Sequence, residues 1–201
     1  MPLHAYCDAT ENDEFYIVAG CIGPEAAWMT FSKRWYAILK ERPRLGYYRT
    51  SDALALKGQF QRFSAVSRDQ RVARLAGVIP DDESCLAVAS YVSKQDFRAF
   101  FTPNFLPAWD DPYYLCSIHL IEHTCRVLSV GSGPKERIDF IFDRQGKVGG
   151  RFRLVYNAFL KPISQFHFPF LGEVRHEDKE MFIALQAADM QAGWIRRKLA
   201  R

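Results

Sequence analysis

The chain has 201 residues, of which 48% are hydrophobic and 25% are charged, a composition typical of a globular protein with a full core and not of a disordered chain. Its net charge of +4 permits a polyanionic partner but is too small to argue for one. No apolar run approaches the roughly 20 residues of a membrane-spanning helix, and no signal-peptide pattern opens the chain, so we expect a cytoplasmic protein that does not bind a membrane.

The first elements along the chain are predicted to form a β-hairpin. The segment "LHAYCDA" alternates between two faces as a strand does, and it places Asp8 near its carboxyl end. "TEND" has the residues of a turn. The segment "EFYIVAGCIG" then predicts a second strand, which the short turn would pair with the first.

Helices are predicted next, before a third strand. Pro24 opens one helix, and Pro43 ends it. A second helical stretch is expected from Ser51, which is a candidate N-cap, to about Leu75. The segment "SCLAVASYVS" is then predicted to be the third strand.

The second half of the chain alternates helices with strands. The pair Asp111 and Pro112 introduces the helix "YYLCSIHLIEHTCRVLSV", which Gly131 and Gly133 end. "RIDFIFD" predicts a strand with Asp143 at its carboxyl end. "GRFRLVYNAFL" is expected to be helical and "SQFHFPF" to be a short aromatic strand.

The last predicted helix, "MFIALQAADMQAGWIRR", is apolar almost all round, yet it carries Asp189 near its middle. A helix that is apolar on several sides is usually buried, and an unpaired buried carboxylate is costly. Asp189 must therefore have a partner. The helix by itself leaves three kinds open: a cation, a hydrogen-bond network, or water in a cleft.

This order of elements predicts a single α/β domain over residues 1–201, in which helices flank a mixed sheet. Sites in open sheets of this kind gather beyond the carboxyl ends of the strands. Asp8 and Asp143 each lie at such an end, and Asp189 lies in a helix that must pack on the sheet. We therefore expect the three carboxylates to meet at one point.

Converging carboxylates raise one another's pKa unless a cation is present between them. Mg²⁺ and Mn²⁺ prefer carboxylate and water ligands, and two such ions about 3.5–4 Å apart can promote hydrolysis of a phosphodiester. Gln186 lies one turn before Asp189 and could orient a ligand or the attacking water. The pattern thus predicts a divalent-metal site on the three aspartates, with Gln186 as a supporting catalytic residue.

Several motifs are spread between Tyr6 and Arg197, and they are "YCDATENDEFYIVAGCIG", Trp28, Trp35, "YYRTSDALALKGQF", "FIFDRQ" and "HEDKEMFIALQAADMQAGWIRR". Together these motifs resemble the family known as domain of unknown function 3800. The resemblance implies a ribonuclease H-like fold with a helical insertion between the second and third strands. The acidic residues that the resemblance implies are Asp8, Glu122, Asp143 and Asp189. Together with the predicted metal site, this set favours a Mg²⁺- or Mn²⁺-dependent nuclease acting on DNA or RNA.

One departure from the family favours a different function. After its first aspartate the family has Glu-Ser-Gly, whereas this chain has Ala9, Thr10 and Glu11. An acid beside the predicted site is therefore lost. This loss favours the alternative of a non-catalytic nucleic-acid or protein-interaction module that keeps the same fold.

A third function follows from "HLIEH", which matches the His-x-x-Glu-His pattern of zinc peptidases. His119 and His123 would share one helix face and could bind Zn²⁺, with Glu122 as the base. The third ligand would come from downstream glutamates, for which the candidates are Glu173, Glu177 and Glu180. The five cysteines include no C-x-x-C pair and predict neither a disulfide framework nor a zinc knuckle.

Overall fold

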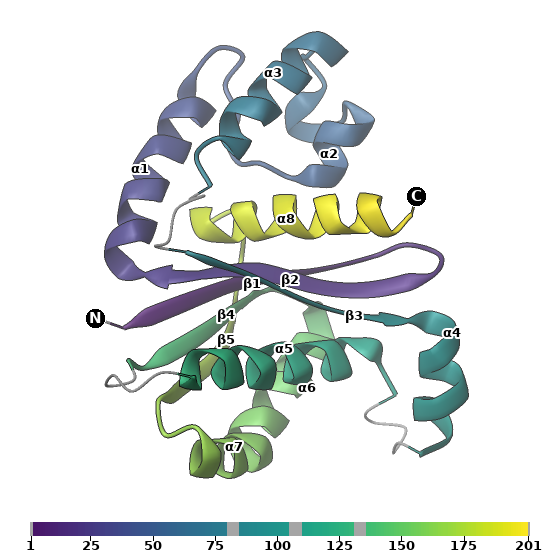
Figure 1. Cartoon of the computed structure of the whole chain (residues 1–201). Coiled ribbons are helices and arrows are strands. Elements are labelled where there is room, and N and C mark those ends of the chain that lie inside the picture. Colours follow the sequence, from purple (N-terminus) through teal and green to yellow (C-terminus); the bar gives the residue numbers. More distant parts are fainter. Residues whose placement is uncertain (1, 80–84, 105–109, 131–135, 201) are drawn as a thin grey trace.

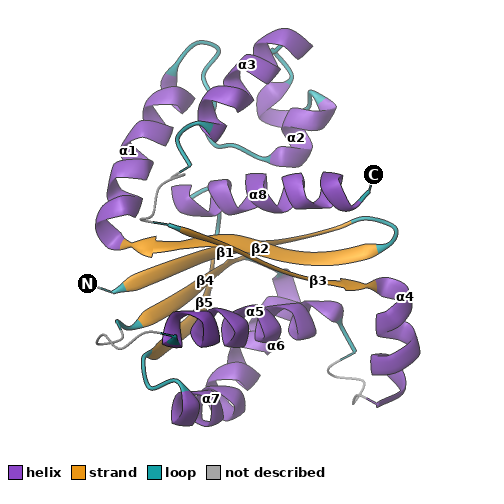
Figure 2. Cartoon of the chain, viewed as in Figure 1, coloured by secondary structure: helices purple, strands orange, loops and turns teal. Residues whose placement is uncertain are grey.

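The computed structural model describes residues 2–79, 85–104, 110–130 and 136–200, with a five-stranded sheet across the middle (Figures 1 and 2). The strands are β1 (Leu3–Glu11), β2 (Phe15–Pro24), β3 (Leu86–Ser93), β4 (Ile138–Asp143) and β5 (Leu171–Glu177). Their order in the sheet is β3-β2-β1-β4-β5. The β1–β2 and β2–β3 pairs are antiparallel, and the β1–β4 and β4–β5 pairs are parallel. This mixed sheet is consistent with the ribonuclease H-like fold that the sequence predicts.

Helices cover both faces of the sheet (Figure 1). One face is covered by α8 (Ile183–Leu199), which packs on β1 and β2, and the other by α5 (Pro112–Ser129), which packs on β2 and β3. The predicted insertion between the second and third strands lies beyond α8 and contains α1 (Glu25–Lys40), α2 (Thr50–Ala55), η1 (Gly58–Phe60) and α3 (Ala65–Ala76). The remaining helical segments among the described residues are α4 (Lys94–Asp96), η2 (Phe97–Phe101), η3 (Thr102–Asn104), α6 (Gly146–Val155), η5 (Tyr156–Leu160) and α7 (Lys161–His167).

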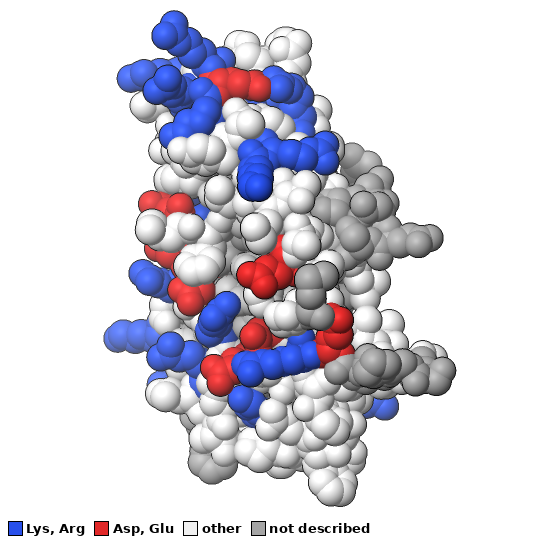
Figure 3. Space-filling model, turned by 90° about the vertical axis from the view of Figure 1, so that its left-hand side faces the viewer, with Lys and Arg blue, Asp and Glu red and all other residues white. Residues whose placement is uncertain are grey.

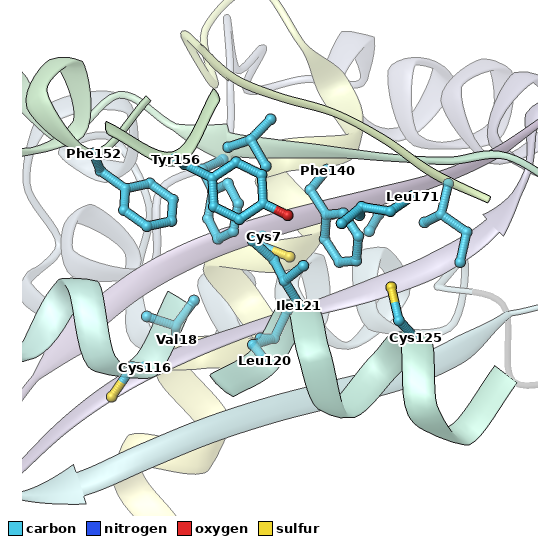
Figure 4. Packing of buried hydrophobic residues seen from close by; sticks show 14 of the residues in the cluster. Cys7, Val18, Cys116, Leu120, Ile121, Cys125, Phe140, Phe152, Tyr156 and Leu171 are labelled. Atoms are coloured by element: carbon cyan, nitrogen blue, oxygen red, sulfur yellow. The ribbon is translucent and has the colours of Figure 1, made fainter. Parts of the chain in front are cut away.

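Alternation along β1 separates the two sides of the sheet, as its sequence predicts. Ala5 and Cys7 are fully buried on the α5 side, in a core to which α5, β4 and α6 contribute (Figure 4). Tyr6 packs on the α8 side, against a second core formed by α8 and the insertion. Asp8 follows Tyr6 by two residues, so its side chain also lies on the α8 side.

The long helical stretch predicted after α1 is in fact divided. Leu56 and Gly58 both have a φ of 50°, in the left-handed region, and they end α2 after six residues. The predicted N-cap Ser51 is also wrong, because α2 begins at Thr50. The capping serine is Ser64, whose hydroxyl accepts a hydrogen bond at the start of α3.

The predicted strand "SQFHFPF" is wrong as well. Its first four residues complete α7, at the end of a helical segment that begins with α6. The strand that pairs with β4 is the next segment, β5. The aromatic residues of this segment alternate with a period of two, as in a strand, but they do not share one buried face. Phe166 is 83% exposed, whereas Phe168 and Phe170 pack at the margin of the core.

The other predicted elements are confirmed with small shifts at their ends. Asp111 is the N-cap of α5 and accepts a hydrogen bond from the backbone N–H of Tyr113. The expected stop at Gly131 and Gly133 lies outside the described residues. Within the described part of the chain, no helix is both long and apolar enough to cross a bilayer.

Candidate functional site

The structure brings together the three aspartates that the sequence singles out. Asp8 lies in β1 and Asp143 is the last residue of β4, and these two strands are parallel neighbours. Asp189 comes from α8, which crosses the same face of the sheet. Asp8 is 3% exposed and Asp143 is 8% exposed, so two of the three carboxylates are removed almost entirely from water.

A lysine ammonium occupies the point at which the three carboxylates meet. Lys179 lies between β5 and α8, and its Nζ is 2.6 Å from Oδ2 of Asp8, 3.0 Å from Oδ2 of Asp143 and 2.9 Å from Oδ1 of Asp189. Lys179 is itself only 8% exposed. The partner that Asp189 requires is therefore a cation supplied by the chain itself.

Backbone N–H groups hold the other oxygen of each carboxylate. The donors are Ala9 to Oδ1 of Asp8, Lys179 to Oδ1 of Asp143 and Thr50 to Oδ2 of Asp189. Each carboxylate therefore has one oxygen fixed by the main chain and one directed at the ammonium. This arrangement orients the three side chains before any ligand arrives.

Burial and charge shift the pKa values within the cluster in different directions. Burial raises the pKa of Asp8 to about 8, because the opposing effect of the Lys179 ammonium is outweighed by burial together with the carboxylates of Asp189 and Asp143. For Asp189, burial acts in the same direction, but the Lys179 ammonium and the Thr50 hydrogen bonds outweigh it and hold the pKa below its usual range. Burial acts to lower the pKa of Lys179, but the three carboxylates raise it well above its ordinary value.

Gln186 does not face the cluster, and its predicted role in orienting water is wrong. Its side chain is 1% exposed. Oε1 accepts hydrogen bonds of 2.9 Å from the Trp35 indole and from the Tyr48 backbone N–H, and Nε2 donates to the Lys179 carbonyl at 3.0 Å. Gln186 therefore joins the insertion and the Lys179 turn to α8, and it is a positioning residue.

Glu122 is not brought to the cluster either. It is exposed on α5, on the opposite face of the sheet from α8. His119 and His123 are also exposed there, and their rings stack with centroids 5.8 Å apart. The candidate zinc ligands Glu173 and Glu177 lie in β5, at the far edge of the sheet from the strands beneath α5.

The carboxylate cluster lies at the floor of a cavity of about 250 Å³ with a basic rim. Three arginines line the cavity, each from a different element: Arg49 before α2, Arg144 after β4 and Arg196 in α8. Glu11, the acid displaced from the family position, is outside this cavity and pairs with Lys94 at 2.8 Å. The site thus places buried carboxylates beneath guanidinium groups, which recognise phosphate well.

The donor chemistry of the cluster fits a hard divalent cation, because all three side chains are carboxylates and their free oxygens converge where a cation already lies. The Lys179 ammonium fills that position, however. In this arrangement, no group of three His, Cys, Asp or Glu side chains in the described ranges is placed to hold a metal ion. A metal ion therefore fits the ligand set only once the ammonium has moved away.

Sequence reasoning missed Lys179 and Thr50. The sequence held a signal for Lys179, because three converging carboxylates need a cation and "HEDKE" contains a lysine in the connection just before α8. Thr50 lies in "YYRTSD", a motif of the resemblance, and it donates to Asp189 through its main chain, which no side-chain pattern could reveal.

No protein-family model and no curated protein matches the chain in sequence.

Proposed function

We propose that this protein is a divalent-metal-dependent hydrolase of nucleic-acid phosphodiesters, related to the family of unknown function 3800 that its motifs resemble. The observation that carries the proposal is the convergence of Asp8, Asp143 and Asp189 on one cation position beneath three arginines. When bound there, Mg²⁺ or Mn²⁺ would supply activation of water and stabilisation of the leaving oxygen.

The residues at the floor of the cavity would bind the metal, and those at its rim would bind the substrate. Asp8, Asp143 and Asp189 would hold the metal, with their backbone hydrogen bonds fixing their orientation. The rim arginines would bind the phosphate of the substrate through their planar, multidentate donors. No nucleophilic side chain is required, because water is the attacking group.

The charge of the insertion supports a polyanionic substrate. Residues 25–79 contain eleven Lys and Arg but only four Asp and Glu, so the insertion carries +7 while the whole chain carries +4. Figure 3 shows Lys and Arg side chains gathered at the end of the molecule that the insertion forms. Three arginines of the insertion, Arg42, Arg44 and Arg62, line a hollow and form no ion pair with a described residue. Such a surface favours a nucleic-acid backbone.

Calorimetric titration of Mn²⁺ into the wild type, Asp189→Asn and Asp13→Asn tests the proposal. Asp13 is an exposed carboxylate in the β1–β2 turn, so its variant is the matched control. We expect wild type and Asp13→Asn to bind Mn²⁺ and to cleave single-stranded DNA or RNA, with both properties lost in Asp189→Asn while its circular dichroism stays unchanged. If the wild type neither binds Mn²⁺ nor cleaves nucleic acid at millimolar Mn²⁺, the proposed function is overturned.

One observation favours a second candidate, a non-catalytic nucleic-acid-binding module. Lys179 already gives each of the three carboxylates a cationic partner, so the fold needs no metal at this point. This module would bind oligonucleotides equally well in EDTA and in Mn²⁺, and it would never cleave them. The cleavage assay above therefore separates the two functions.

A further inference from the structure

We propose that Lys179 is a built-in cation that competes with the divalent metal for its site, so that metal binding requires its ammonium to leave. This inference rests on the proposed function, because it concerns the metal site that function requires. It assigns Lys179 a role as the residue that sets metal affinity and holds the carboxylates together while no metal is bound.

The contacts of the ammonium carry the first step. Its three partners at 2.6–3.0 Å are the same three carboxylates that would ligate the metal, and they engage it with the oxygens that the main chain leaves free. A metal ion and this ammonium therefore cannot both use those oxygens. Occupation by one excludes the other.

Charge gives the direction of the competition. When all three carboxylates are ionised, as metal ligands must be, they and the ammonium sum to −2, so Lys179 alone leaves the ionised cluster under-neutralised. A divalent ion in place of the ammonium brings the sum to −1. The divalent ion is thus favoured by the carboxylates, while the ammonium has the advantage of being covalently attached and needs no capture from solution.

The main chain allows the side chain to leave without moving the site. The Lys179 N–H is bonded to Asp143, and the Lys179 carbonyl accepts a hydrogen bond from the buried Gln186 side chain. The backbone N–H and the backbone carbonyl of Lys179 are therefore both held by hydrogen bonds. The side chain itself lines the cavity of about 250 Å³ beneath the rim arginines, which gives the displaced ammonium a place beside the expected phosphate position.

The test compares Mn²⁺ affinity and thermal stability in wild type, Lys179→Met and Lys94→Met. Methionine keeps the length and apolar stem of lysine but removes the charge. Lys94 is the matched control because its ammonium also pairs with a carboxylate, that of Glu11, outside the site. We expect Lys179→Met to bind Mn²⁺ at least tenfold more tightly than wild type, and Lys94→Met to bind as wild type does.

Stability supplies a readout that does not depend on catalysis. In EDTA, Lys179→Met should melt at a lower temperature than wild type, because three converging carboxylates, two of them buried, then lack their cation. Mn²⁺ should raise its melting temperature by more than it raises that of wild type. The double variant Lys179→Met/Asp189→Asn should lose the tighter binding, which places the gained affinity at the cluster.

The outcomes separate this inference from the proposed function. Equal Mn²⁺ affinity in wild type and Lys179→Met would overturn the inference and leave the metal site intact. Binding in neither protein would overturn both. Binding in Lys179→Met alone would support the inference in its strongest form, a lysine that displaces the metal altogether. If Lys179→Met folds only when Mn²⁺ is present, as followed by circular dichroism, that dependence supports it as well, and Lys179→Gln then serves for the titration.

Discussion

At the scale of single residues, Asp189 shows both the reach and the limit of sequence reasoning. The periodicity of its helix indicates that the carboxylate is buried and needs a partner. The structure confirms the partner, but the Asp189 side chain is 13% exposed and is therefore only partly buried. The identity of the partner could not follow from periodicity. Lys179 lies outside the helix, in a connection whose path is set by how β5 and α8 pack, so only the tertiary structure directs its ammonium to the carboxylate.

Gln186 illustrates the opposite error. Its position one turn before Asp189 suggested that the two side chains share a face and a task. The groups that Gln186 binds are an indole and a backbone N–H from the insertion and a carbonyl from the Lys179 turn. Because two of these three are main-chain groups, no pattern of side chains could have predicted them.

His176 gives a prediction about pH. Its Nε2 lies 2.7 Å from the Tyr113 hydroxyl in the core on the α5 side, and burial, with a smaller effect of Arg153, lowers the pKa of the imidazole to about 4. The unfolded chain takes up this proton near pH 6.5, whereas the folded protein takes it up only near pH 4. Protons therefore favour the unfolded state in this window, and the free energy of unfolding should fall as pH drops through it.

Urea denaturation at pH 7 and pH 4.5 measures this effect in wild type and in His176→Gln. We expect the wild type to lose about 1–2 kcal/mol more than the variant over this range, allowing for partial exposure of the ring. Carboxylates that titrate in the same range contribute to both proteins and cancel in the comparison. An equal loss in the two proteins would show that His176 is not the group responsible.

At the scale of elements, the close approach of α2 to α8 completes the candidate site. Thr50, the first residue of α2, bonds to Asp189 through its N–H and to the Asp189 carbonyl through its hydroxyl. Gly193 makes this approach possible, since a Cβ at that position would lie 2.5 Å from Cγ2 of Thr50. The sequence predicted both helices but not their contact, because the helix that supplies Thr50 was expected to begin one residue later.

Gly193→Ala should therefore separate the two helices. We expect it to lower the free energy of unfolding by about 1–3 kcal/mol through overpacking and to weaken Mn²⁺ binding by releasing Asp189 from Thr50. Adding Thr50→Ser should recover most of the stability, because the nearest remaining Thr50 side-chain atom is then the hydroxyl oxygen, at 3.2 Å. Urea denaturation of the single and double variants measures the recovery.

Gly150→Ala is the matched control, because a Cβ at Gly150 in α6 meets no atom within 4 Å. Replacement of a helical glycine by alanine should there stabilise the protein by about 0.5–1 kcal/mol. If Gly193→Ala behaved like Gly150→Ala, the close approach of α2 to α8 would not be a constraint on the folded protein.

At the scale of the whole molecule, the mixed sheet and its flanking helices could be predicted because they depend on local signals. Strand alternation, turn residues and helix ends recur along the chain in the order that the structure shows. The two wrong assignments, the undivided helical stretch and the aromatic strand, fall where a local signal was weak or misleading. Leu56 adopts a left-handed conformation that its residue type does not announce, and Phe166 is an exposed aromatic residue.

The uneven distribution of charge between the insertion and the rest of the molecule predicts how the proposed binding of nucleic acid would respond to salt. If Arg42 and Arg44 contact phosphates, the variant Arg42→Ala/Arg44→Ala should reduce the magnitude of the slope of log K against log salt concentration by about 1.4, because each phosphate contact to a single strand contributes about 0.7. Fluorescence anisotropy with a single-stranded oligonucleotide in EDTA, between 50 and 200 mM NaCl, measures the slope. Arg98→Ala/Arg126→Ala removes the same charge from exposed positions outside the insertion and should leave the slope unchanged.

The hydrogen bond from Thr50 to Asp189 limits how this fold could be shortened or used as a scaffold in design. A chain from which residues 25–79 were excised would retain Asp8, Asp143, Asp189 and Lys179, every charged member of the cluster. It would nevertheless lose the Thr50 N–H that fixes Asp189. It would also lose the Trp35 indole and the Tyr48 backbone N–H that hold the Gln186 side chain. The insertion therefore contributes groups that hold the candidate site together. An ancestor or a redesign without it would need another way to hold α8 in place.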